Sequence, residues 1–415
     1  MVNRPFRKLM RVEAALRLSF GSVETVKGIE RVRIERALGR VLARQIVAKK
    51  YLPPHDIAVV DGYAVRSIDL RHPSRKPVTL RLVGRSKLGE LSRIRIRRGE
   101  TVAVATGSMV PRGGDAAVMI EDTKMRGGNR VEFRESIKPL EGVTRRGDDL
   151  KPGRVVLERG SRLRPEDIGV LKALGLTSVQ VVRRVRVAIL STGDELVNKA
   201  RRGDSAKTVD LNRPILKGML RELDASVVDL GIVKDDEAAI RAALRRGLSD
   251  ADLVLVTAGS SVGNSDLVSR CIDSLGKPGM IVHGVAMRPA MPTGVAVIEG
   301  KPIVSLPGFP VSAVFAFRVF VRPLIAKLVG APDTHDPTIT ATLSERIHRI
   351  KGGRTFVRVR VKKVWSGYVA VPVAAQRSSI LTSIVDANGI VTIPESVSQI
   401  DAGTKVWVTL TGAVS

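Results

Sequence analysis

Acidic residues, glycines and prolines are concentrated in four short segments at the C-terminal ends of predicted strands. They are TGDE (192–195), DD (235–236), AGSSVGNSD (258–266) and PGFP (307–310). Carboxylates can hold Mg²⁺ together with a substrate phosphate, and glycine-rich backbone followed by a helix can bind an anion. These segments therefore predict a metal-assisted site for a phosphorylated ligand.

Each segment also has an ordinary structural explanation. The run 258–266 could be a plain turn between a strand and a helix. Taken singly, the acids could cap helices or lie in their first turns: Asp194, Glu195, Asp235, Asp236 and Asp266. Their occurrence after successive strands favours a functional site, in which either Asp235 or Asp236 is the functional acid of its pair.

Strands and helices must alternate to position these segments. Continuous aliphatic runs predict strands at 185–192, 226–233, 252–258 and 280–287, and amphipathic runs predict helices at 211–224, 236–249 and 266–275. Two further strands (294–300 and 301–306) lead into PGFP and a helix that ends at Gly330. This order predicts an α/β domain with a parallel sheet, whose ligands bind beyond the carboxyl ends of the strands.

The whole chain predicts a multidomain α/β plus β fold, because 415 residues correspond to roughly two to four domains. We expect a helical connecting and dimerisation region (1–51 and 141–183), a β insertion domain (52–140) and the α/β domain (184–330). Alternating runs over 335–415 predict a C-terminal small β-barrel or sandwich.

Composition excludes several classes of protein. The chain has 69 lysine and arginine residues against 41 acids, a net charge of +28, but only 3% aromatics and no recognition motif, so we expect no specific nucleic-acid partner. A single cysteine, Cys271, excludes an internal disulfide. The start does not resemble a signal peptide, and charges interrupt the apolar run 311–329. We therefore expect a soluble, cytoplasmic protein with no membrane partner.

Eight collinear motifs resemble one family. They are LPPHDIAVVDGYAV (52–65), ATGSMVPRGGDAAVMIED (105–122), TRRGDDLKPG (144–153), RVRVAILSTGDELV (184–197), VDLN (209–212), GIVKDD (231–236), TAGSSVGNSD (257–266) and LPGFPVSA (306–313). The chain resembles the molybdopterin molybdenumtransferase family (MoeA), which is related to the E domain of gephyrin. Without the resemblance, Asp61 would be assigned to a hairpin turn and the charged run 145–149 to a solvated loop.

The resemblance implies a four-domain protomer with a MogA-like α/β domain, assembled as a homodimer. The active cleft would then lie between two subunits, so that Asp61 and Thr106 act across the interface. The implied activity is insertion of molybdate into adenylylated molybdopterin, with Mg²⁺ required and AMP released. Molybdopterin adenylyltransferase is then an expected partner.

The resemblance also implies roles for particular residues. The catalytic acids would be Asp149, Asp194, Glu195, Asp236 and Asp266, of which Glu195, Asp236 and Asp266 would hold the metal. The residues implied in binding the pterin, its phosphates and the oxyanion are Asp61, Thr106, Thr192, Gly193, Gly259, Ser260, Ser261, Gly263, Arg288, Pro307 and Pro310.

The chain departs from the common family pattern at the oxyanion site. Residues 288–292 read RPAMP where relatives commonly have KPGKP, so Ala290 replaces a glycine and Met291 replaces the second lysine. Ala258, Ser260 and Phe309 also differ from the usual residues. Arg288 keeps one cation, and Arg145, Arg146 or Lys234 could compensate for the other; alternatively, the chain could favour tungstate. A noncatalytic pterin carrier or gephyrin-like scaffold is the competing interpretation, against which the acids at the strand ends argue.

Overall fold

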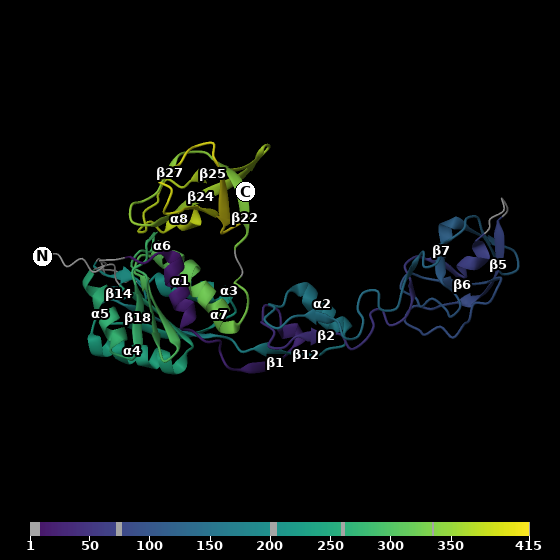
Figure 1. Cartoon of the computed structure of the whole chain (residues 1–415), viewed down its shortest axis with the longest axis horizontal. Helices are drawn as coiled ribbons and strands as arrows, with labels where there is room; N and C mark the ends of the chain where they lie inside the picture. The colour runs from purple at the N-terminus through teal and green to yellow at the C-terminus, as the bar shows by residue number, and fades with distance from the viewer. Residues whose placement is uncertain (1–8, 72–76, 200–205, 259–261, 334–335, 415) are drawn as a thin grey trace.

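The computed structural model describes the chain except residues 1–8, 72–76, 200–205, 259–261, 334–335 and 415. The molecule is elongated, with the β insertion domain at one end and the α/β domain towards the other (Figure 1). The connecting region lies between them, and the C-terminal domain lies beside the α/β domain. This arrangement confirms the predicted fold class.

The α/β domain is built on a six-stranded sheet. In spatial order its strands are β16 (Ser226–Val233), β13 (Arg186–Thr192), β17 (Leu253–Ala258), β21 (Lys301–Pro307), β20 (Gly294–Ile298) and β18 (Pro278–His283). The first four are mutually parallel, whereas β20 is antiparallel to both of its neighbours. The parallel strands are aliphatic because helices cover both faces of the sheet; every residue of β17 is buried.

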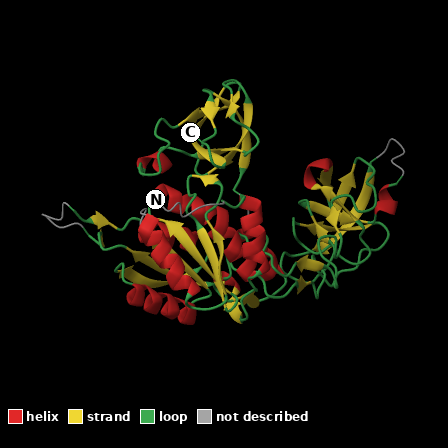
Figure 2. Cartoon of the chain, turned by 60° about the vertical axis from the view of Figure 1, so that its left-hand side comes forward, coloured by secondary structure: helices red, strands yellow, loops and turns green. Residues whose placement is uncertain are grey.

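Helices pack on both faces of this sheet (Figure 2). They are α1 (Val12–Gly21), α3 (Asn212–Glu222), α4 (Glu237–Asp250), α5 (Val262–Asp273), α6 (Pro310–Ala316) and α7 (Arg322–Val329), with a π-helical turn (Phe317–Val321) joining the last two. One core contains apolar residues of α4 and α5, and the other contains those of α1, α3, α6 and α7. Within the described residues, no helix is long and apolar enough to cross a membrane.

The N-terminal fifty residues contain less helix than their spacing predicts. Among residues 9–50, which the structure describes, only α1 is an α-helix, and it packs against the α/β domain. Strand β1 (Ile29–Arg33) instead pairs with β12 (Ser178–Val182), and β2 (Ile46–Val47) pairs with β11 (Val155–Leu157) beside α2 (Pro165–Ala173). The β-branched Val32 packs with Val179 and Val181, so tertiary pairing overrides the local helical pattern.

The insertion domain is a six-stranded sheet with its own core. Its spatial order is β7 (Ala116–Met119), β4 (Gly62–Val65), β6 (Glu100–Val104), β5 (Val78–Arg85), β9 (Arg130–Phe133) and β8 (Thr123–Arg126). Tyr63 and Phe133 meet edge to face in this core, with ring centroids 6.2 Å apart. At its neck, β3 (Ile57–Ala58) pairs with β10 (Val143–Thr144).

The C-terminal domain is a closed barrel, which decides between the two architectures expected there. Its strands are β24 (Arg354–Val364), β25 (Gly367–Pro372), β22 (Thr338–Leu343), β28 (Lys405–Leu410) and β26 (Gly389–Ile393), and β24 pairs with β26 to close the ring. Helix α8 (Thr382–Val385) and the pair β23 (Ile347–His348) and β27 (Gln399–Ile400) lie outside the ring. The short strand β19 (Met287–Arg288) of the α/β domain pairs with β24 and joins the two domains.

A paired arginine and aspartate connect β12 of the connecting region to β17 of the α/β domain. The Arg183 guanidinium donates two hydrogen bonds of 2.7 Å to the Asp252 carboxylate, which also accepts the Arg186 N–H at 2.9 Å. Burial raises the pKa of Asp252, but these bonds outweigh it and hold that pKa below its usual value. The carboxylate therefore stabilises the fold in its charged form.

We expect Asp252→Asn to lower the free energy of unfolding by about 1–3 kcal/mol at pH 7. The folded-state pKa is depressed, so this stabilisation is present above the unfolded pKa of about 4 and is lost as pH falls through the folded value. Urea denaturation at pH 7 and at about pH 3 measures this stabilisation, with Asp250→Asn as control, because Asp250 is only half-buried and forms a 3.6 Å surface ion pair with Arg246. An equal deficit of Asp252→Asn at neutral pH and at about pH 3 would contradict this assignment.

Candidate active site

The carboxyl ends of the parallel strands bring the TGDE and DD segments together. The Asp235 N–H donates to Asp194 Oδ1 at 3.3 Å, and the Gly193 N–H donates to the Val233 carbonyl at 3.2 Å. The other two segments follow β17 and β21 at the same edge of the sheet. The predicted gathering of these segments at one edge is therefore observed.

The acids at this edge have different surroundings. Asp236 precedes α4, and its carboxylate accepts the Ala239 N–H at 2.8 Å, which is the capping arrangement considered as its structural alternative. The exposed Glu195 carboxylate lies over Gly193, where an added Cβ would be 2.8 Å from Oε2. The Glu195 carbonyl accepts the Thr208 N–H at 2.9 Å, but its carboxylate has no hydrogen bond or ion pair with any described residue and is therefore available to a ligand.

Several predicted binding residues cannot be placed in the site geometry. Gly259, Ser260 and Ser261 lie outside the described residues, and the side-chain surroundings of Gly263 and Asp266 in α5 are not described either. Thr192 is buried, and its hydroxyl donates to the Thr257 carbonyl at 3.5 Å. In this arrangement Thr192 links strands β13 and β17.

The described residues show no group of three or more histidines, cysteines and acids arranged to hold a metal. Two of the expected metal ligands differ in whether their carboxylates are free to bind a metal. The Asp236 carboxylate caps α4, whereas the Glu195 carboxylate has no partner among the described residues. Mg²⁺ commonly uses only one or two protein carboxylates together with water and substrate phosphate. Glu195 and the neighbouring Asp194 fit that requirement.

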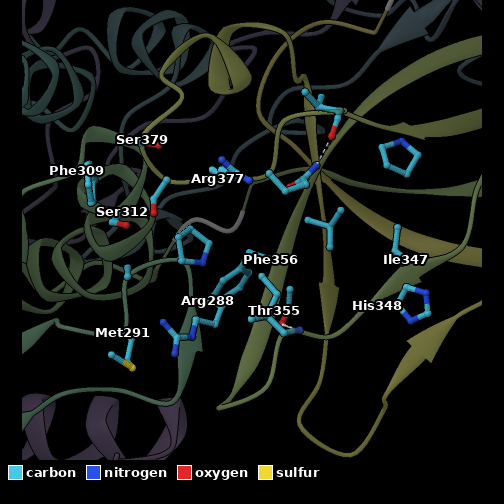
Figure 3. A pocket seen from close by; sticks show the side chains of 18 of the residues that line it. Arg288, Met291, Phe309, Ser312, Ile347, His348, Thr355, Phe356, Arg377 and Ser379 are labelled. Atoms are coloured by element: carbon cyan, nitrogen blue, oxygen red, sulfur yellow. Dashed lines mark hydrogen bonds between the residues drawn. The ribbon is translucent and has the colours of Figure 1, made fainter. Parts of the chain in front are cut away.

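A second part of the site is a cavity of about 870 Å³ between the α/β domain and the C-terminal barrel. Figure 3 shows Arg288, Phe309 and Ser312 from the α/β domain around the same space as Phe356 and Arg377 from the barrel. The described lining contains the acid Glu345 and more basic side chains than acids. The basic residues are Arg288, Arg346, His348 and Arg377. The cavity therefore suits an anion that also has apolar surface.

Arg288 is held where the two domains meet. Its strand β19 pairs with β24, and its Nε is buried without a hydrogen-bond partner among the described residues. Ala290 follows in a left-handed conformation (φ 79°), which glycine adopts more readily than alanine. The neighbouring Met291 also lines the cavity, so both departures from the usual pattern lie at the predicted oxyanion site.

Of the two prolines of the PGFP loop, only Pro307 is among the residues that line the cavity. Pro307 ends β21 and lines the cavity, whereas Pro310 begins α6 at a position where proline is favourable. Asn212, at the start of α3, donates from Nδ2 to the Gly308 carbonyl at 2.8 Å. Its Oδ1 is buried and has no partner among the described residues, so Asn212 fixes the loop and leaves one acceptor unused.

Three predicted residues lie away from these strand ends within one chain. Asp61 accepts the Thr106 N–H at 2.8 Å in the insertion domain, at the far end of the molecule (Figure 1). The Asp149 N–H donates to the Leu52 carbonyl at 3.1 Å near the neck of that domain. The fold of one chain does not bring Asp61 and Thr106 to the acids of the α/β domain.

The cations suggested as replacements for the missing lysine do not line the cavity. The Arg146 guanidinium lies 4.0 Å from the centroid of the Tyr51 ring at the neck, and the neighbouring Arg145 N–H donates to Asp148. Lys234 is also absent from the described lining. Arg346 and Arg377 of the barrel do line the cavity and add positive charge to it, whereas compensation by Arg145, Arg146 or Lys234 stays a prediction.

Sequence reasoning missed the contribution of the barrel. Arg346, His348, Phe356 and Arg377 lie in segments interpreted only as parts of a β domain. The polar run QRSS (376–379) between two aliphatic strands was the available signal. No sequence periodicity indicates which face of a barrel packs on another domain, so the packing itself was needed to find these residues.

Three family descriptions match consecutive parts of the chain. Residues 10–175 match the MoeA N-terminal region (domain I and II), residues 188–327 match a "Probable molybdopterin binding domain", and residues 340–411 match the MoeA C-terminal region (domain IV). Together they cover the insertion domain, the strand-end acids and the barrel.

Relatives match over nearly the whole length. Molybdopterin molybdenumtransferase of Haemophilus influenzae is 32% identical over 91% of this chain and 93% of its own, and molybdopterin molybdenumtransferase 2 of Mycobacterium tuberculosis is 34% identical over 91% and 94%. A crystal structure of the molybdopterin biosynthesis MoeA protein from Pyrococcus horikoshii superimposes with a TM-score of 0.85, at 29% identity, covering 97% of this chain and 100% of that one. The chain therefore belongs to the MoeA family of molybdopterin molybdenumtransferases, enzymes of molybdenum cofactor biosynthesis.

Proposed function

We propose that this enzyme inserts molybdate or tungstate into adenylylated molybdopterin and releases AMP in a Mg²⁺-dependent reaction. One observation carries the proposal. A basic cavity lies at the same edge of the sheet as the acids Asp194 and Glu195. One part suits an oxyanion and the other suits a metal-bound phosphate. A volume of about 870 Å³ leaves room for more than the oxyanion, as a pterin substrate requires.

Different residues of the proposed site would bind the oxyanion, position the loop beside it and hold the metal. Arg288, Arg346 and Arg377 would attract the dianionic oxyanion, and Asn212 would hold the PGFP loop against it. Glu195 and Asp194 would hold Mg²⁺, which supplies charge neutralisation at the phosphoanhydride. The exposed carboxylates would also position the oxygen nucleophile that displaces AMP, while the dithiolene sulfurs of the pterin take up the metal of the oxyanion.

We further propose that the active assembly is a homodimer. The surface around Asp61 supports this, because the apolar side chains of Val59, Met119 and Ile120 are all exposed there. The Ile120 N–H donates to the Asp61 carbonyl at 2.9 Å, so these apolar residues adjoin the predicted functional acid. Exposed apolar surface beside a polar site indicates coverage by another protein surface. A second copy would bring Asp61 and Thr106 to the strand ends.

The competing function is a noncatalytic pterin carrier, which the replacement of lysine by Met291 favours. The two functions differ in whether AMP is released. Purified enzyme mixed with adenylylated molybdopterin, Mg²⁺ and either oxyanion should release AMP only when oxyanion is present and should retain the metal in the pterin. Tight pterin binding without AMP release would instead establish the carrier.

The Glu195→Gln variant should release AMP at a rate reduced by about tenfold to a hundredfold, because it removes a carboxylate from the metal-assisted site. The exposed Glu24→Gln, which removes one charge far from the cavity, is the matched control. Initial rates at saturating and limiting Mg²⁺ measure the effect. Unchanged rates at both concentrations would remove Glu195 from the mechanism.

Met291→Lys should tighten oxyanion binding by about tenfold, because it adds a cation to the cavity lining. The Met291 carbonyl accepts the Val285 N–H at 2.9 Å, and the substitution leaves that backbone bond in place. Isothermal titration with molybdate and tungstate measures both affinities. Met125→Lys, which adds the same charge on the exposed β8, should leave them unchanged; equal affinities for wild type and Met291→Lys would contradict the placement of the oxyanion.

Asp61→Ala and Glu195→Gln, as separate proteins, should each release AMP at no more than about a tenth of the wild-type rate, but they should complement each other when refolded as a mixture. If each site takes Asp61 from one subunit and Glu195 from the other, random pairing restores about a quarter of wild-type activity. Either variant refolded alone is the control, and sedimentation reports the dimer. A mixture no more active than its components would show that the two residues do not act across an interface.

A further inference from the structure

A buried arginine lies directly behind the wall of the cavity. Arg358 is 1% exposed, whereas the neighbouring Val357 and Val359 belong to the barrel core. Its Nη2 donates to the Ala375 carbonyl at 3.2 Å. The Nε and Nη1 atoms are buried and have no hydrogen-bond partner among the described residues, and no described carboxylate forms an ion pair with Arg358.

The wall is held mainly by groups other than this guanidinium. The Arg358 N–H donates to Gln376 Oε1 at 3.1 Å, and Gln376 Nε2 donates to the carbonyls of Arg358 at 2.8 Å and Val373 at 2.7 Å. The Val373 N–H also donates to the Arg358 carbonyl at 3.0 Å. Gln376 and backbone atoms therefore hold the loop, and one hydrogen bond from the side chain of Arg358 adds to them.

An unpaired buried charge destabilises a fold. Removing a cation from water without a carboxylate partner is costly, and an apolar side chain of similar volume is often better tolerated at such a position. Burial lowers the pKa of the Arg358 guanidinium, but an arginine remains protonated at neutral pH. Local stability therefore does not explain this residue.

We infer that Arg358 is a positioning residue that supplies a fixed positive field to the oxyanion cavity from behind its wall. The carbonyl that it contacts belongs to Ala375, which lies between the lining residues Ala374 and Gln376. Salt screens a buried charge far less than an exposed one, so its field persists at high ionic strength. The inference rests on the proposed oxyanion function of the cavity.

The test compares Arg358→Met, Arg358→Lys and Arg360→Met in the full chain. Arg360 lies two residues along the same strand, is exposed and donates from Nε to the Asp386 carbonyl at 2.8 Å, so its removal changes the net charge equally. Titration calorimetry with molybdate and with tungstate, at about 0.05 M and about 0.5 M salt, gives the affinities. Thermal unfolding of each variant gives the stability.

Arg358→Met should bind both oxyanions about tenfold more weakly at either salt concentration, while its unfolding midpoint stays the same or rises. Arg358→Lys should stay within about threefold of wild type because it keeps the charge. Arg360→Met should bind as wild type does. Weaker binding together with higher stability is the result that a purely structural role would not produce.

Three outcomes overturn the inference. Wild-type affinity in Arg358→Met would show that the buried charge does not act on the cavity. Both Arg358→Met and Arg358→Lys could bind the oxyanions weakly and unfold at a lower temperature. That result would show that Arg358 acts only through the structure of the wall. A wild-type protein that binds neither oxyanion would reject the oxyanion cavity itself, and that result would separate failure of the proposed function from failure of this inference alone.

Discussion

The active-site half of this enzyme depends on the parallel pairing of β16, β13, β17 and β21. Parallel strands in register end at a common edge, so four segments distant in the sequence, from residue 192 to residue 310, become neighbours. The helices that cover both faces make this pairing possible, because a parallel sheet must be buried on both sides. The bond from the Asp235 N–H to Asp194 is a direct result of that register.

The cavity is lined by residues of the barrel as well as by residues at the edge of the sheet. The two-residue strand β19 extends from the α/β domain onto β24, and this pairing places Arg288 beside the barrel residues. On the other side, Asn212 holds the PGFP loop through the Gly308 carbonyl. An anion in the cavity would thus contact two domains at once, so the affinity for it depends on how rigidly they are joined. On the barrel side of the wall, Gln376 donates hydrogen bonds to the carbonyls of Arg358 and Val373.

Charge is used in three different ways in this strongly basic chain. At the junction with the connecting region, Arg183 is fully paired with Asp252 and contributes stability. In the cavity, basic side chains outnumber acids and are available to an anion. Behind the cavity wall, Arg358 is buried without a carboxylate partner among the described residues, at a cost to stability. Positive charge therefore stabilises the fold where it is paired with a carboxylate and destabilises it where it is buried without one.

The sequence alone determined the α/β domain, the order of its strands and the position of the acids at their ends. The strand predicted at 280–287 was wrong in its limits, because the structure has β18 at Pro278–His283 and places Met287 in β19. The predicted strand 226–233 is β16 itself, because a β-branched and aliphatic run between two amphipathic helices is typical of a strand. The motifs also identified the family. Only the tertiary structure decided that residues 29–33 pair as a strand, that Asp236 caps α4, and that Arg346 and Arg377 reach the cavity. Periodicity records how each segment is buried, whereas these features depend on which distant segments or side chains meet, and that is decided by packing.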